Sequence, residues 1–175
     1  MTDIKIEKLK YPIGKFVLPE SFTLEQRKKD IATINDLPFI LRQTIFNFND
    51  TQLDTQYRPG GWTARQVVHH LADSHMNSFI RFKLTLTEDT PTIKPYKEAL
   101  WCDMEECKSM PVNASLSILD GVHERLTNVL RGMNDSDFQK KLHHPEQQKD
   151  LSLDAMLALY SWHSKHHLRH IQSLK

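Results

Sequence analysis

Residues 63–87 decide the fold, and they read TARQVVHHLADSHMNSFIRFKLTLT. Thr63 and Gln66 have the spacing of a capping box, in which each side chain binds the other residue's backbone amide at the start of a helix. Apolar residues then recur at intervals of three and four, a period that is typical of an amphipathic helix. The recurring residues are Val67, Leu71, Phe79, Phe82 and Leu86. The pattern predicts a helix from Thr63 to about Thr87.

Three further stretches have the same helical period, at about residues 23–45, 113–132 and 152–175. Thr23 and Gln26 have the spacing of a second capping box. Pro38 lies inside the first of these stretches and cannot donate a backbone hydrogen bond, so we expect a kink or a break near Asp36. Four amphipathic helices in one chain predict an all-α four-helix bundle.

The segments between the helices are rich in turn-forming residues. We expect residues 1–22 to form an extended arm, and residues 90–111, where Thr90-Pro91 and Lys94-Pro95 interrupt regular structure, to form a long loop. Residues 135–150 are expected to hold a short turn and a small hairpin. Because the sequence has no internal repeat and no low-complexity tract, we expect a single domain over residues 1–175.

The composition excludes several classes of protein. The chain has 175 residues, 39% of them hydrophobic, and a formal net charge of +1. This balance argues against a nucleic-acid or membrane partner, and no apolar run approaches the ~18 residues of a membrane span. The first residues lack the apolar core of a signal peptide. Cys102 and Cys107 are too few for a secreted disulfide framework, so we expect free thiols and a cytoplasmic location.

Three of the ten histidines have the positions of metal ligands. His163 and His167 are four residues apart, so they lie one turn apart on the same face of the last helix. Such a pair also occurs on helices that bind no metal, but His70 adds a third imidazole from the inward face of the helix of residues 63–87. Three histidine ligands leave at least one open coordination position, which is typical of a catalytic rather than a structural site, and they suit zinc, nickel or iron.

The neighbouring histidines are expected to face elsewhere. His69 and His166 are each rotated by roughly 100° from a predicted ligand, so we expect both to point away from the ion, with His69 in solvent. His170 lies one turn beyond His167 and can be its neighbour or its hydrogen-bond partner. The stretch His143-His144-Pro145, in the expected hairpin, can contribute a further ligand.

Polar residues follow His70 along its helix face, where a packed core would have leucine or valine. They are Ser74, Asn77, Ser78 and Arg81. This pattern predicts the wall of a cavity, in which Arg81 can bind a substrate carboxylate through two hydrogen bonds. Asp73 lies one turn from His70 and can orient an imidazole or act as a general base, although an exposed acid on a helix has the same pattern.

The chain resembles the DinB/YfiT-like superfamily over nearly its whole length. The most specific matching stretches are Tyr57–Thr63, Val67–Ser78 and Trp162–Ile171, with Pro95-Tyr96 and His144-Pro145. The metal ligands of that family fall on His70, His163 and His167. The resemblance implies a four-helix bundle, a cytoplasmic location, a homodimer, and one divalent ion per chain, with zinc the first expectation and nickel the second.

Three functions fit these features. The first is a metal-dependent hydrolase, in which the ion activates water for attack on an ester, an amide or a similar bond. The second, which the resemblance also implies, is an S-transferase that uses a low-molecular-weight thiol such as bacillithiol on the same ion. The third is a non-catalytic metal-binding stress protein, whose open coordination position would be blocked by His170 or another ligand. The first two require a small-molecule substrate, and the resemblance favours the hydrolase.

Overall fold

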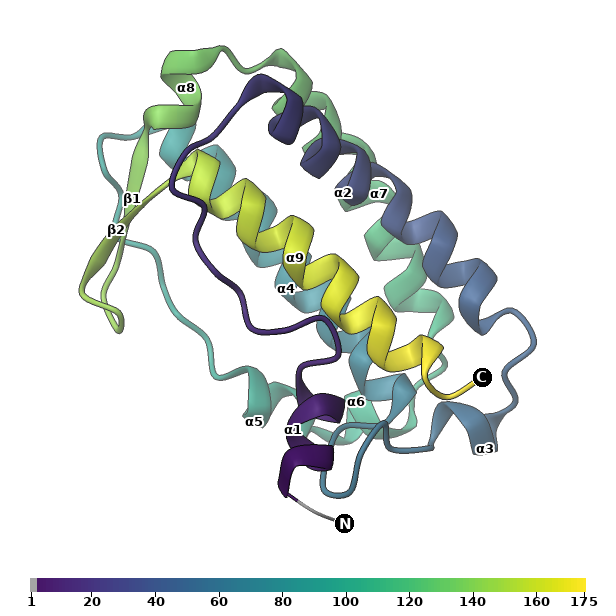
Figure 1. Ribbon diagram of the computed structural model, residues 1–175. Helices are drawn as coiled ribbons and strands as arrows, with labels where there is room; N and C mark the ends of the chain where they lie inside the picture. Colours follow the sequence, from purple (N-terminus) through teal and green to yellow (C-terminus); the bar gives the residue numbers. More distant parts are fainter. Residues whose placement is uncertain (1–2) are drawn as a thin grey trace.

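Four long helices form the body of the protein, which a computed structural model describes over residues 3–175 (Figure 1). They are α2 (Leu24–Ile45), α4 (Ala64–Thr87), α7 (Asn113–Gly132) and α9 (Leu153–Gln172). Short helices and one hairpin make up the other elements of the described chain: α1 (Asp3–Lys10), α3 (Asp50–Leu53), α5 (Glu98–Cys102), α6 (Glu105–Ser109), α8 (Asp135–Gln139), β1 (Lys141–His144) and β2 (Lys149–Ser152). The predicted all-α four-helix bundle is confirmed.

The predicted helix starts carry capping hydrogen bonds. The Thr63 hydroxyl accepts from the Gln66 backbone amide at 3.2 Å, and the Gln66 side chain accepts from the Thr63 amide at 2.9 Å. This completes the capping box of α4. At α2 the Thr23 hydroxyl accepts from the Gln26 amide at 3.2 Å, but the Gln26 side chain donates to Asp30. The second predicted capping box is therefore only half formed.

The long helices follow an up-down-down-up order along the chain. α4 and α7 are parallel, because His69 faces Ser115 and, further along both helices, His75 faces His123. α2 and α9 run side by side in the same direction, opposite to α4 (Figure 1). Two parallel neighbours need a connection that returns along the bundle. Residues 88–112 make this connection and carry α5 and α6.

The core consists of two apolar clusters with a polar layer between them. One cluster includes Leu41, Leu71 and Leu119, and the other includes Phe82 and Leu126. Between these positions lie side chains that are buried and polar: Ser74, His75 and Ser78 of α4, His123 of α7, and Ser161, Ser164 and His167 of α9. The cavity described below opens beside this layer.

α2 continues as one helix through Pro38, so the predicted break is wrong. A proline inside a helix leaves the carbonyl four residues earlier without its usual amide donor. That carbonyl belongs to Ile34, and the Nδ1 atom of His123 lies 2.5 Å from its oxygen. A side chain of α7 thus replaces the missing backbone donor, and the sequence of α2 alone gives no sign of it.

Two segments that were expected to be irregular contain short helices. α1 lies in the predicted arm, and Lys8 and Lys10 in its last turn interact favourably with the helix dipole. α5 and α6 lie in the predicted long loop, and they bury Cys102 and Cys107 as free thiols. Helices of eight residues or fewer are too short for their apolar periodicity to be recognised.

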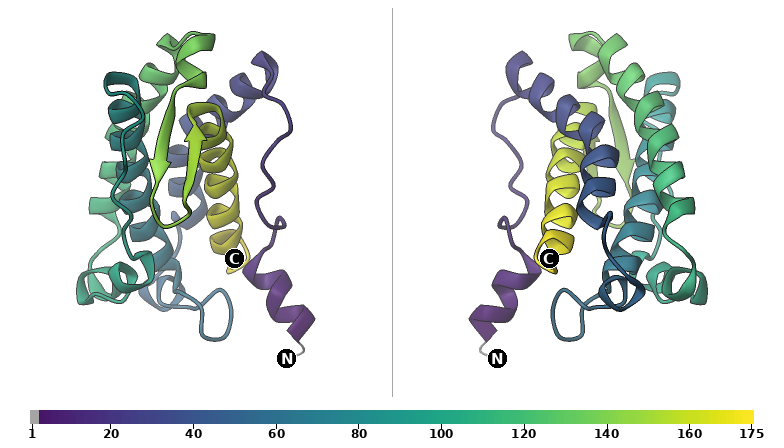
Figure 2. Two further views of the ribbon diagram at one scale, coloured as in Figure 1. Left: turned by 90° about the vertical axis from the view of Figure 1, so that its left-hand side faces the viewer. Right: turned by 90° about the vertical axis from the view of Figure 1, so that its right-hand side faces the viewer.

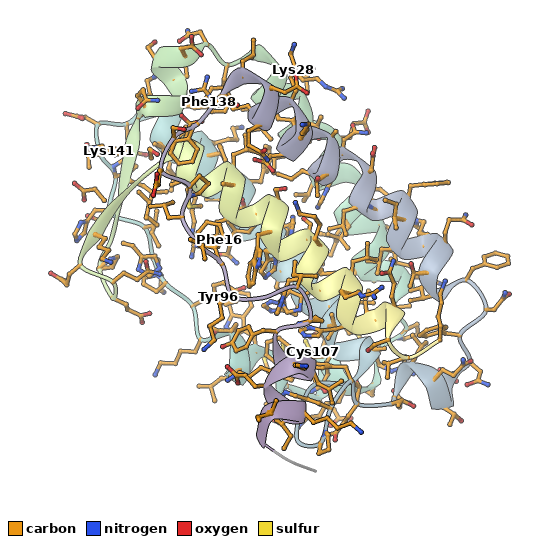
Figure 3. The ribbon with its side chains drawn as sticks, in the orientation of Figure 1. Phe16, Lys28, Tyr96, Cys107, Phe138 and Lys141 are labelled. Carbon is orange, nitrogen blue, oxygen red and sulfur yellow. The ribbon has the colours of Figure 1, made fainter. Side chains whose placement is uncertain are left out.

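The hairpin and the N-terminal arm both lie beside α9 (Figure 2). β1 and β2 pair antiparallel in the region where a hairpin was predicted, and His143 also bridges to Thr92 of the long connection. Phe16 of the arm packs on Trp162 with ring centroids 5.9 Å apart (Figure 3). Within residues 3–175, no helix has both the length and the apolar character of a membrane span.

Candidate metal centre

The structure brings together the three histidines that the sequence predicts as metal ligands. His70 comes from α4, and His163 and His167 come from successive turns of α9. One ligand nitrogen from each lies within 4.8 Å of those of the other two. The Nε2 atoms of His70 and His163 are 3.2 Å apart. Because α4 and α9 are antiparallel neighbours, residues 93 and more positions apart in sequence meet at one point.

The spacing of these nitrogens fits a small divalent ion. Two imidazole nitrogens bound to a tetrahedral zinc at about 2.0–2.1 Å lie about 3.3–3.4 Å from one another. The separation of 3.2 Å between the Nε2 atoms of His70 and His163 is close to this value. The separation of these two nitrogens therefore fits zinc without a large movement of α4 relative to α9.

The electrostatics of the three imidazoles favour metal binding. Burial is the main cause that lowers the pKa of His70 to about 4 and those of His163 and His167 well below their usual value. Neighbouring histidines lower these pKa values further, because a second positive charge nearby is unfavourable. The three side chains are consequently neutral near pH 7, and their nitrogen lone pairs are available to an ion.

The triad lies at the side of a cavity of about 450 Å³. The cavity is lined by Trp62, His70, Ser74, Arg81, Pro95, Tyr96, Glu98, His144, Glu146, Gln147, Tyr160, Trp162, His163, His166 and His167. The Trp62 ring lies 4.7 Å from that of His70, measured between centroids. Tyr96 comes from the long connection (Figure 3). Aromatic side chains thus surround the ligands, and several polar groups face the same space.

The predicted polar wall is partly correct. Ser74 and Arg81 line the cavity. The guanidinium of Arg81 reaches the Lys94 carbonyl at 3.5 Å, and among the described residues it forms no ion pair with a carboxylate. Asn77 and Ser78 are wrong as wall residues, because neither is among the described residues that line the cavity. The Asn77 amide donates to the Asp73 carbonyl of its own helix at 2.9 Å, and Ser78 is fully buried.

Asp73, the predicted general base, is not among the residues that line the cavity in the described chain. Burial, with Glu106 nearby, raises the pKa of Asp73 to about 6, and Asp73 in turn raises the pKa of Cys107. In the described chain no side-chain hydrogen bond joins Asp73 to His70, whose Nε2 atom lies beside that of His163.

Two histidines that were expected to point away are buried. His69 is 2% exposed, and its ring nitrogens lie 2.7 Å from the Ser115 hydroxyl and 3.1 Å from the Met110 carbonyl. The expectation of a solvated His69 is wrong because the long connection and α7 cover that face of α4. His166 is also buried, lines the cavity and stacks on Trp162 at 4.4 Å.

His170 was expected beside the triad or within its hydrogen-bond network. Its Nε2 atom lies 3.2 Å from the Lys10 carbonyl, and its ring stacks on Tyr57 at 3.8 Å. The ligand nitrogens of His166, His167 and His170 also lie within 4.8 Å of one another. His170 therefore contacts the end of α1, and it does not belong to the group of His70, His163 and His167. His144 lines the cavity but is likewise outside that group.

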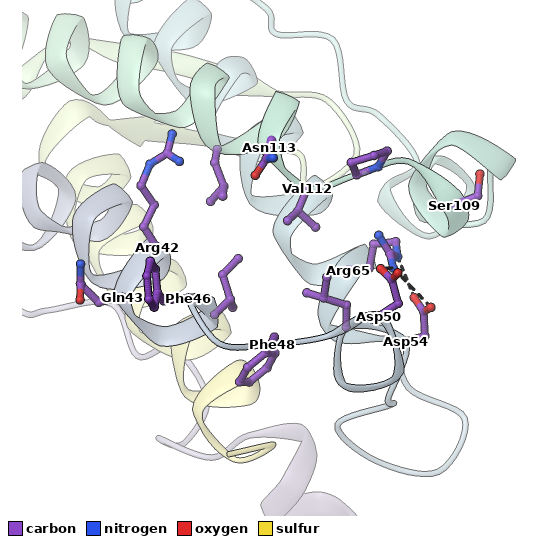
Figure 4. A pocket seen from close by; sticks show the side chains of 14 residues that line it. Arg42, Gln43, Phe46, Phe48, Asp50, Asp54, Arg65, Ser109, Val112 and Asn113 are labelled. Atoms are coloured by element: carbon purple, nitrogen blue, oxygen red, sulfur yellow. Dashed lines mark hydrogen bonds and ion pairs between the residues drawn. The ribbon is translucent and has the colours of Figure 1, made fainter.

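A second, larger cavity of about 850 Å³ lies where α2 and α3 meet the starts of α4 and α7 (Figure 4). Its central cation, Arg65, is bound by Asp50 at 2.9 Å and by Asp54 at 2.7 Å. The charges there neutralise one another, and no histidine or cysteine lines this cavity in the described chain. Its larger volume alone does not make it the candidate active site.

Three imidazoles that converge beside a cavity define a helical-bundle protein with the donor set of a metal site. The profile of the DinB superfamily matches residues 40–171, and the chain belongs to this superfamily.

The names of the sequence relatives describe them as putative metal-dependent hydrolases. The chain is 48% identical over 166 residues to a Bacillus subtilis protein named "Putative metal-dependent hydrolase YfiT", with 95% of this chain and 93% of the relative covered. It is 49% identical over 167 residues to a Bacillus mycoides protein with the same description, with 95% of each covered.

A solved structure is similar over nearly the whole chain. The structure of YfiT from Bacillus subtilis matches with a TM-score of 0.93 and 47% identity over 95% of both chains. It is described as a probable metal-dependent hydrolase with an unusual four-helix bundle topology.

Proposed function

We propose that His70, His163 and His167 hold one divalent ion and that the protein uses it to hydrolyse a small-molecule substrate. The observation that carries this proposal is the convergence of three neutral imidazoles on one cavity. The names of the relatives support metal dependence and hydrolysis at a general level. When bound there, such an ion supplies Lewis acidity, which polarises a carbonyl and lowers the pKa of a coordinated water.

The donor set supports zinc first and nickel second. All three ligands are imidazole nitrogens, and no thiolate contributes, because both cysteines lie in α5 and α6 with their pKa values raised by burial. Imidazole ligands suit both zinc and nickel. Three protein ligands and an open position resemble catalytic zinc sites more than structural ones.

The cavity residues supply recognition and exclude water. Arg81 presents a guanidinium with no carboxylate partner in the described chain, so it can bind an anionic group of the substrate through two hydrogen bonds. Trp62 and Trp162 cover apolar parts of the substrate and keep bulk water from the triad. Asp73 receives no role in proton transfer, since it lies outside the cavity lining.

The S-transferase remains the second candidate. A cavity of about 450 Å³ has room for a small thiol beside a second reactant. The described chain supplies no thiol to this cavity, so the thiol would have to enter from solution. This alternative therefore predicts turnover only when a low-molecular-weight thiol is added.

One activity screen separates the two reactions. We expect the zinc-loaded protein to hydrolyse activated esters without any thiol, and a chelator to abolish the reaction. The Arg81→Gln variant should lose activity toward esters with a carboxylate more than toward neutral esters, because only the former use the guanidinium. Turnover of an electrophile that depends on added thiol would support the S-transferase. No turnover of either kind, with the ion bound, would support the non-catalytic alternative.

A further inference from the structure

A second pair of buried histidines lies directly behind the triad. His75 of α4 and His123 of α7 are 0% and 1% exposed. The Nε2 atom of His75 lies 3.3 Å from the Nδ1 atom of His163. The other ring nitrogen of His163, Nε2, is the one that faces His70. His75 therefore contacts the predicted ligand His163 on the side of its ring away from the triad.

The protonation of His163 follows from this arrangement. An imidazole that binds an ion through Nε2 carries its remaining proton on Nδ1. That Nδ1–H must then donate to the Nε2 atom of His75, which acts as the acceptor at 3.3 Å. His75 in turn must carry its own proton on Nδ1. A metal-binding histidine nearly always donates its second N–H to a partner that fixes the ring, and here the partner is another imidazole.

The ring of His75 is itself held by its neighbours. It stacks on the ring of His123, with centroids 4.7 Å apart and an angle of 20° between the planes. Tyr160 packs against it edge-on at 5.3 Å and 84°. With zero exposure and contacts on its face and its edge, the His75 ring has little freedom to turn its Nε2 away from His163.

The orientation of His123 depends on the proline of α2. The Nδ1–H of His123 donates to the Ile34 carbonyl at 2.5 Å. That carbonyl is free to accept because Pro38, four residues later, has no N–H. The chain of contacts thus runs from Ile34 through His123 and His75 to His163, and it links α2, α7, α4 and α9 in the polar layer of the core.

We propose that His75 is a positioning residue for the metal centre: it accepts the Nδ1–H of His163, fixes the tautomer and the ring orientation of that ligand, and is supported by His123. This inference rests on the metal site of the proposed function, but not on any reaction. Loss of such a partner typically weakens metal affinity by about 10- to 100-fold.

The test compares two variants of His75 with a matched control. Zinc affinity is measured by competition with a chromophoric chelator for the wild type, His75→Leu, His75→Gln and His69→Gln. Leucine removes the acceptor, so we expect affinity to fall by about 10- to 100-fold. Glutamine can place its amide oxygen where Nε2 stood and should restore most of the affinity. His69 is equally buried on the same helix but contacts Ser115 and Met110, so its variant should bind zinc like the wild type.

A spectroscopic measurement distinguishes positioning from a general effect on folding. In the cobalt-substituted protein the Nδ1–H of each bound histidine gives a shifted, exchangeable proton signal. We expect the signal of His163 to exchange faster with solvent in His75→Leu, and to be retained in His75→Gln and His69→Gln. If His75→Leu does not fold, the affinity and the signal of His75→Gln decide, since both should stay near the wild type.

Three outcomes would overturn the proposal: unchanged affinity and an unchanged proton signal in His75→Leu, equal losses in the leucine and glutamine variants, or an equal loss in His69→Gln. A wild type that binds zinc but hydrolyses no ester leaves the inference intact and removes only the proposed reaction. A wild type that binds no divalent ion removes both.

Discussion

At the residue scale, the histidines of α4 differ in what their ring nitrogens can reach. His70 faces His163 with its Nε2, whereas His69 is bound to Ser115 across the interface with α7. Helix geometry predicts that adjacent residues point about 100° apart, and it correctly separated these two. It could not show that the face of His69 is covered, because the covering segment comes from elsewhere in the chain.

Replacing His163 or His167 by alanine should remove the bound ion and lower the melting temperature of the zinc-treated protein, because binding stabilises the folded state. The matched control is His69→Ala. It should keep the ion but lower the free energy of unfolding by about 1–3 kcal/mol, since the Ser115 hydroxyl loses its partner. Metal content and thermal unfolding measured on the same samples check both expectations. Loss of the ion in the His69 variant would contradict the assignment of the ligands.

The buried His123 predicts how stability depends on pH. Burial lowers the pKa of His123 from 6.5 to about 4, although its bond to Ile34 opposes this. The unfolded chain therefore binds this proton more readily than the folded one, so stability is complete above pH 6.5 and falls as the pH drops toward 4. This lowering of the pKa corresponds to roughly 3 kcal/mol of stability at most.

Denaturation of metal-free protein between pH 7 and 4 tests this expectation. His123→Asn keeps an amide donor where Nδ1 lies but cannot titrate, so its stability should fall less steeply with pH than that of the wild type. The other buried histidines contribute equally to the pH dependence of stability in both proteins. Equal slopes in the two proteins would show that protonation of His123 does not contribute to the loss of stability at low pH.

At the element scale, the starts of the long helices could be predicted and the short helices could not. A capping pair such as Thr63 and Gln66 is a local signal, and a helix of 20 or more residues repeats its apolar period several times. α1, α5 and α6 have no such repeat. Pro38 misled the prediction for α2, because the donor that replaces its N–H is a histidine of α7.

The capping box of α4 contributes measurably to the free energy of unfolding. Thr63→Ala removes the hydroxyl that accepts from the Gln66 amide, so we expect a loss of about 0.5–2 kcal/mol in the free energy of unfolding. Thr33→Ala is the control, because its exposed hydroxyl bonds only to the Lys29 carbonyl of its own helix. Urea denaturation should show no loss for that variant. A Thr63 variant as stable as the wild type would mean that another group caps α4.

At the scale of the whole molecule, four helical stretches predicted the class of fold but not the direction of each helix. Periodicity shows which face of a helix is buried and says nothing about the neighbour against which it packs. The order up-down-down-up follows from the returning connection of residues 88–112. The sequence could predict that His70 meets His163 and His167, because of their residue type and the helix faces on which they lie. The distances between them could be known only from the packed bundle.

We predict that the whole chain unfolds as one domain. The polar layer links all four long helices, so none of them should unfold alone. Calorimetry should show a single transition, which zinc at 100 times its dissociation constant stabilises by about 2.7 kcal/mol. Two separate transitions would contradict the single domain. The homodimer also stays a prediction, and sedimentation of the same sample measures it.

The most direct test of the central claim is the metal content of untagged protein by native mass spectrometry, with His70→Ala beside the wild type. We expect one divalent ion per chain in the wild type and none in the variant, because His70 is the ligand that joins α4 to the pair on α9. A wild type that holds no ion even after incubation with zinc and nickel would contradict the claim, and so would a variant that keeps its ion.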